Sequence, residues 1–145
     1  MIWERTPLAN SAIRAWLCIL TVACGLGVRG FGLGVGLPAF VVKYGGSIPW
    51  ATMVFFLVAM AASRLTRRNI ALISAGIAIC VESFRLVHAP WLDAFRLTLP
   101  GALLLGRIFS AWNLVAYGVG IVLAVGLDLF AAFSVSRLRR HANAR

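Results

Sequence analysis

The chain has 145 residues, of which 61% are hydrophobic and only 12% are charged, whereas a soluble domain is about 45 to 50% apolar and about 25% charged. A soluble globule of this size cannot bury so much apolar surface, so the composition excludes that class. The formal charge of +10 would raise nucleic acid as a partner of a soluble protein. Here most cations lie at the edges of apolar segments, and we expect a membrane protein that contacts lipid and no nucleic acid.

Four apolar segments are long enough to cross a hydrocarbon core of about 30 Å, which takes about 20 helical residues. They are residues 15–34, 44–63, 69–89 and 108–134. The third becomes polar at Glu82 and ends before Pro90, because the residue preceding a proline is disfavoured in a helix. The alternating pattern of membrane β-barrel strands is absent. We predict an all-α fold, a polytopic transmembrane four-helix bundle that forms a single domain over residues 1–145.

The distribution of Lys and Arg predicts the orientation, because these residues are retained on the cytoplasmic side. With the N-terminus inside, nine cations fall on the inner side: Arg5, Arg14, Arg64, Arg67, Arg68, Arg137, Arg139, Arg140 and Arg145. Five fall on the outer side: Arg29, Lys43, Arg85, Arg96 and Arg107. The clusters at 64–68 and 137–140 favour an N-in/C-in topology, and the five outer cations run against the rule.

No motif for catalysis or for a cofactor is evident. The glycines from Gly25 to Gly30 have the spacing of a dinucleotide fingerprint, but they lack the preceding strand and the later acid, and close helix contact or a helix break explains them better. His88 and His141 fall on opposite sides of the membrane, so they do not form a zinc set. No hydrolase triad, P-loop or paired catalytic carboxylate appears. We expect a protein without catalysis, cofactor or metal.

Polar residues near the outer boundary form the candidate site. Glu82 and Arg85 are three positions apart on one helix face and can pair. A charge at membrane depth costs roughly 2.5 to 3.5 kcal/mol on insertion scales, so Glu82 needs a wet cavity or a cation. The available cations are Arg29, Arg85 and Arg96.

The last span carries a polar stripe. Asn113 and Tyr117 are four positions apart, and Asp128 returns to nearly the same face eleven residues later, after about three turns. We expect this stripe to face the bundle interior.

Two interpretations of the outer cluster compete. In the first, its charges pair among themselves and fix the helix register. In the second, its surplus cations bind phosphate or carboxylate, because five cations face only two acids, Glu82 and Asp93. An anionic lipid headgroup or a lipid-linked phosphate suits the second interpretation. The candidate ligand-binding residues are Arg29, Lys43, Tyr44, Glu82, Arg85, Arg96, Asn113 and Tyr117.

An ordered set of residues spreads over roughly 100 positions: Gly27, Arg29, Pro38, Lys43, Tyr44, Gly45, Trp50, Ala51, Glu82, the segment from His88 to Asp93, Arg96, Leu97, Thr98, Gly101, Gly106, Phe109, Asn113, Leu114, Tyr117 and Gly120. In this order the chain resembles an uncharacterised bacterial family of small four-span membrane proteins, classed as a domain of unknown function. The resemblance implies a multi-pass protein of the bacterial inner membrane. That family usually carries acids where this chain has Ser47 and Asn113, and a Gln where it has Arg85. More distantly, the chain is similar to the VanZ-like family.

The leading functional hypothesis is a non-catalytic inner-membrane protein with an outer-facing basic pocket for an anionic lipid or envelope precursor. One alternative is a small proton-coupled transporter that forms a homo-oligomer and uses Glu82 or Asp128 as its exchangeable charge. Another is a membrane partner of a larger complex, recognised through the basic tail 137–145.

Overall fold

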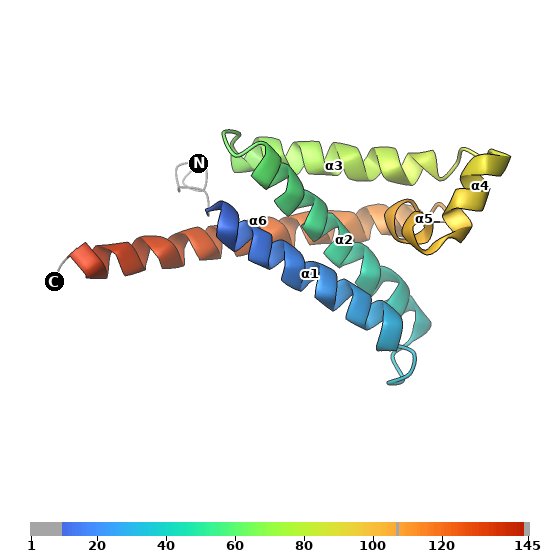
Figure 1. The fold of residues 1–145 in the computed structure, drawn as a ribbon, viewed down its shortest axis with the longest axis horizontal. Coiled ribbons are helices and arrows are strands. Elements are labelled where there is room, and N and C mark those ends of the chain that lie inside the picture. Colours follow the sequence, from blue (N-terminus) through green and yellow to red (C-terminus); the bar gives the residue numbers. More distant parts are fainter. Residues whose placement is uncertain (1–9, 107, 144–145) are drawn as a thin grey trace.

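The computed structural model describes residues 10–106 and 108–143, which form six helices and no strand (Figure 1). The all-α prediction is confirmed. The helices are α1 (Ser11–Phe31), α2 (Ala39–Ala61), α3 (Arg67–Phe84), α4 (Pro90–Leu97), α5 (Leu99–Leu104) and α6 (Ala111–Asn143).

Short polar residues begin several of these helices. The side chain of Asn10 accepts a hydrogen bond from the Ile13 amide at the start of α1, and Thr66 does the same for Asn69 at the start of α3. Such caps satisfy amide groups that have no partner inside the helix. α4 begins at Pro90, whose fixed φ suits the first helical position and whose missing N–H is not needed there.

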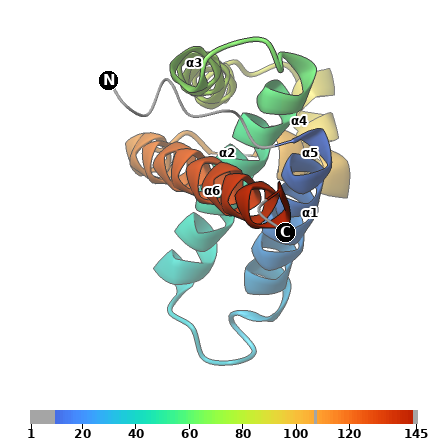
Figure 2. The same cartoon turned by 90° about the vertical axis from the view of Figure 1, so that its left-hand side faces the viewer.

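The four long helices run in alternating directions (Figure 1, Figure 2). α1 packs on α2, and α2, α3 and α6 pack on one another. The starts of α1 and α3 therefore meet the end of α2 and the middle of α6, at Asp128, and we call this the Asp128 end. The other end, where α3 finishes beside the start of α6, is the Glu82 end. The last part of α6 extends past the other helices at the Asp128 end (Figure 1).

The core lies where α2, α3 and α6 meet. Its buried residues include Ala51, Phe55, Phe56, Ile70, Ala78, Tyr117, Ile121 and Ala124. The backbones of α2 and α6 approach closely at Gly120, where a Cβ atom would collide with the carbonyl oxygen of Ile48. Thr52 Oγ1 donates a hydrogen bond of 2.8 Å to the carbonyl of Gly120. A small residue is needed at this crossing, as is common in membrane bundles.

Three of the described helices are long and apolar enough to cross a membrane: α1, α2 and residues 111–138 of α6. The third predicted span is the exception, because α3 has 18 residues and includes Arg67, Arg68 and Glu82. It also ends at Phe84, so the expectation of a helix continuing through residues 85–89 is wrong. The chain there turns toward Pro90, and α4 and α5 fill the connection to α6. The fourth predicted span, residues 108–134, corresponds to α6, which begins at Ala111 and runs past residue 134.

Candidate functional site

A buried carboxylate organises the Glu82 end. The side chain of Glu82, on the last turn of α3, is 0% exposed. Its Oε2 lies 2.7 Å from Nη1 of Arg85 and accepts a hydrogen bond of 2.9 Å from the Tyr117 hydroxyl. Its Oε1 accepts hydrogen bonds from the Ser110 amide at 2.7 Å and from Asn113 Nδ2 at 3.1 Å. Of the three cations considered as partners of Glu82, Arg85 is the one that pairs with it.

Arg85 also holds the chain that leads into α6. Its Nε donates a hydrogen bond of 2.5 Å to the carbonyl of Leu105, and its Nη2 donates one of 3.1 Å to the Tyr117 hydroxyl. Next to it, Gly106 has a φ of +67°, and a Cβ atom there would lie 2.6 Å from the guanidinium carbon. Glycine therefore meets both the backbone and the space requirement at this turn.

A cavity of about 200 Å³ opens beside this network, and we call it the polar cavity. Its lining comes from α1, α2, α5, α6 and the end of α3: Arg29, Lys43, Gly46, Ser47, Trp50, Arg85, Ala102, Leu103, Gly106, Ile108, Asn113 and Tyr117. Five of the eight residues singled out from the sequence line it, although they come from four different helices or helix ends.

The charges around the polar cavity do not balance. Glu82 neutralises Arg85, but within residues 10–106 and 108–143 neither Arg29 nor Lys43 forms an ion pair with a carboxylate. The ammonium of Lys43 lies 5.1 Å from the ring centre of Tyr44, a cation–π contact that leaves its charge in place. Arg107, which the sequence placed in the same outer set, lies outside the described residues.

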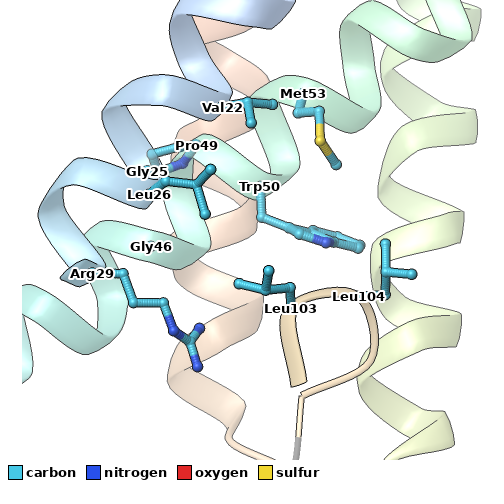
Figure 3. A pocket seen from close by; sticks show the side chains of 10 residues that line it. All are labelled: Val22, Gly25, Leu26, Arg29, Gly46, Pro49, Trp50, Met53, Leu103 and Leu104. Atoms are coloured by element: carbon cyan, nitrogen blue, oxygen red, sulfur yellow. The ribbon is translucent and has the colours of Figure 1, made fainter. Parts of the chain in front are cut away.

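A second cavity, of about 180 Å³, adjoins the first and is lined mainly by hydrocarbon (Figure 3). We call it the apolar cavity. Its lining consists of Val22, Gly25, Leu26, Arg29, Gly46, Pro49, Trp50, Met53, Leu103 and Leu104. Arg29, Gly46, Trp50 and Leu103 line both cavities. The ring of Trp50 also packs against Tyr117, with ring centres 5.1 Å apart.

The other three candidate residues do not line the polar cavity. Glu82 lies behind its wall, bonded to Asn113 and Tyr117. Tyr44 is half-buried under Lys43. The third, Arg96, has a separate set of contacts.

Arg96 is 2% exposed and serves the end of α3. It donates hydrogen bonds to the carbonyls of Phe84 and Val87 at 2.6 and 2.8 Å, and it pairs with Asp93 at 3.0 Å. A guanidinium is well suited to the unpaired carbonyl groups at a helix C-terminus.

Sequence reasoning missed the charged cluster at the Asp128 end. Asp128 is 0% exposed, and its two carboxylate oxygens lie 2.8 Å from Arg14 Nε and 2.7 Å from Arg67 Nε. Arg14 Nη1 also donates a hydrogen bond of 2.7 Å to the carbonyl of Ala59. The sequence prediction uses both arginines only as cytoplasmic orientation signals. Their positions at the inner ends of predicted spans, level with an acid inside the last span, were the signal that pointed to pairing.

An all-helical fold with three membrane-length apolar helices, and with the ion pairs of Asp128 buried between its helices, is that of an α-helical membrane protein. Residues 36–121, more than half of the chain, match the family described as "Protein of unknown function (DUF2809)", and the chain belongs to that family. The expected membership of an uncharacterised family is confirmed, and the likeness to the VanZ-like family stays a prediction. No solved structure matches the chain. The matched region includes Lys43, Glu82, Arg85, Asn113 and Tyr117, while Arg29 precedes it.

Proposed function

We propose that this protein is a non-catalytic, four-span protein of the bacterial inner membrane whose polar cavity faces outward and binds an anionic lipid or envelope precursor. The observation that carries the proposal is the unbalanced charge of Arg29 and Lys43, which both line the polar cavity. A guanidinium and an ammonium group bind phosphate or carboxylate oxygens through charge-assisted hydrogen bonds.

Two features support α3 as the fourth crossing helix. At 1.5 Å per residue its 18 residues span about 27 Å, close to the thickness of a hydrocarbon core of about 30 Å. It also exposes large apolar side chains, including Leu72, Ile73, Ile77 and Ile79, which are suited to lipid.

The cations outside the helix bundle's interior support the orientation. Arg64, Arg68 and Arg137 are exposed at the Asp128 end or on the part of α6 beyond it. By the positive-inside rule this end is cytoplasmic, and the polar cavity then faces the opposite side.

Binding is favoured over proton-coupled transport because both candidate carboxylates are enclosed and fully hydrogen-bonded within the protein. Glu82 and Asp128 are both 0% exposed, and each accepts hydrogen bonds on both oxygens. A role as partner of a larger complex depends on the tail 137–145, most of whose side chains lie outside the described residues.

Native mass spectrometry of protein released from mixed-lipid micelles tests the binding role. Arg29→Gln combined with Lys43→Gln is expected to reduce retention of anionic lipids at least about tenfold, because two charge-assisted contacts to the ligand are lost. Arg68→Gln combined with Arg137→Gln removes the same charge at the other end and serves as the matched control. Equal retention by the wild type and the cavity variant, with both folded, would overturn the proposal.

A further inference from the structure

The two cavities together have the polarity of a lipid molecule. The polar cavity carries the charged groups at the Glu82 end, whereas the apolar cavity adjoins it and is lined by residues of α1, α2 and α5. Arg29, Gly46, Trp50 and Leu103 line both cavities, so the two cavities are adjacent. An adjacent pair of this kind, one polar and one apolar, suits a single ligand with a charged head and a hydrocarbon chain.

The direction of the ligand's hydrocarbon chain follows from the positions of the α1 side chains. Figure 3 shows the guanidinium of Arg29 at one end of the lining and Val22 and Met53 at the other. Arg29 and Val22 are seven residues apart on α1, which corresponds to about 10 Å along the helix. This separation places the polar and apolar parts of a ligand along the axis of α1.

The apolar cavity is open to the protein surface. Leu26 and Leu104, two of its lining residues, are 49% and 54% exposed. In a membrane these side chains border the hydrocarbon core, so a chain can enter between α1 and α5 from the bilayer and only part of it needs to be enclosed.

The charge of the headgroup follows from the charges on the wall. Among the described lining residues, Arg29, Lys43 and Arg85 contribute three positive charges, and Glu82 behind the wall removes one, leaving two. A phosphate monoester carries about −1.5 to −2 at pH 7 and a phosphodiester about −1. The charge of a phosphate monoester therefore matches the surplus of two positive charges.

We propose that the ligand is a lipid ending in a phosphate monoester, with its phosphate between Arg29 and Lys43 and its hydrocarbon chain in the apolar cavity. This inference rests on the proposed function and narrows the ligand class. The phosphate neutralises the two unpaired cations, and the enclosed chain replaces contacts with bilayer lipid by contacts with Val22, Met53 and Leu103.

The experiment compares three probes on the full-length protein in nanodiscs or micelles: dioleoyl phosphatidic acid, dioleoyl phosphatidylglycerol and soluble glycerol 3-phosphate. Two variants narrow the apolar cavity. Val22→Phe fills the end far from Arg29, and Gly46→Leu adds a side chain at the junction, where a Cβ atom meets nothing within 4 Å. Val119→Phe is the matched control, because Val119 on α6 is 45% exposed and lines neither cavity.

We expect the wild type to bind phosphatidic acid at least about tenfold more tightly than either other probe. Phosphatidylglycerol is a phosphodiester and carries less negative charge, and glycerol 3-phosphate has no hydrocarbon chain. Val22→Phe is expected to lower the affinity for phosphatidic acid about tenfold, and Val119→Phe to leave it unchanged. Gly46→Leu is expected to act in the same direction as Val22→Phe.

The outcomes separate the two proposals. If Val22→Phe and Gly46→Leu bind phosphatidic acid like the wild type, or glycerol 3-phosphate binds equally well, the assignment of the chain falls while the anion site stands. Equal binding of phosphatidic acid and phosphatidylglycerol would overturn the assignment of a phosphate monoester as the headgroup. If the Arg29→Gln, Lys43→Gln variant retains every anionic lipid, the proposed function falls as well.

Discussion

Arg14 and Asp128 are 114 positions apart in the chain, yet Arg14 Nε donates a hydrogen bond of 2.8 Å to the Asp128 carboxylate where both side chains are buried. Arg67 binds the other oxygen of the same carboxylate. Asp128 thus ties the first turns of α1 and α3 to the middle of α6, and two cations share one acid.

Asp128→Asn removes the acid on which this cluster depends. Breaking a buried ion pair from one side costs about 3 to 5 kcal/mol, because a charge is left without compensation. We expect a large fall in the unfolding temperature of the purified protein, measured by tryptophan fluorescence in detergent. Asp93→Asn, whose side chain is 45% exposed, is the control and should change little. Equal effects of the two substitutions would contradict a special role for Asp128.

Glu82→Gln should loosen the connection between α5 and α6. The Ser110 amide donates to Glu82 Oε1, and Arg85, which pairs with Glu82, holds the carbonyl of Leu105. Loss of the negative charge weakens both attachments, since hydrogen bonds to charged groups are the stronger ones. Hydrogen–deuterium exchange is expected to rise over residues 105–113 and to stay unchanged at the Asp128 end. Unaltered exchange over that segment would show that Glu82 does not hold it.

Two glycines on different faces of α6, Gly118 and Gly120, should respond differently to substitution by alanine. A Cβ atom at Gly120 collides with the Ile48 carbonyl, so Gly120→Ala is expected to destabilise the α2–α6 contact by about 1 to 3 kcal/mol. A Cβ atom at Gly118 meets nothing within 4 Å, so Gly118→Ala should be neutral or stabilising by up to about 1 kcal/mol. Unfolding in detergent by a denaturing surfactant measures both. A destabilised Gly118→Ala protein would mean that α6 has a second contact there.

The proposed four-span topology predicts which end of α3 is reachable from each side of the membrane. In a background where Cys18, Cys24 and Cys80 are replaced, His88→Cys lies at the Glu82 end and Arg64→Cys at the Asp128 end, and both positions are exposed. An impermeant thiol reagent should label the His88→Cys protein in intact spheroplasts and the Arg64→Cys protein only after permeabilisation. Labelling of both proteins from the same side would show that α3 does not cross.

Local geometry explains the parts of the site that the sequence predicted. Residues three or four apart on a helix share a face, so the pairing of Glu82 with Arg85 and the common burial of Asn113 and Tyr117 were predictable. The same period placed Asp128 on the buried face. Ser47 and Asn113, two positions where the chain departs from the family pattern it resembles, turn out to be hydrogen-bonded to each other at 3.2 Å beside the polar cavity.

The composition and the hydrophobic pattern alone determined the helical membrane class, the approximate helices and the polar stripe of α6, because these depend on residue type and on the helical period. Which cation reaches which acid was decided by tertiary structure. Arg96 binds the carbonyl of Phe84 at the end of α3, and Arg85 pairs with Glu82. Arg14 and Arg67 both pair with Asp128. Such partners lie on different helices, and their distance depends on how the helices pack and rotate, which a local period does not contain.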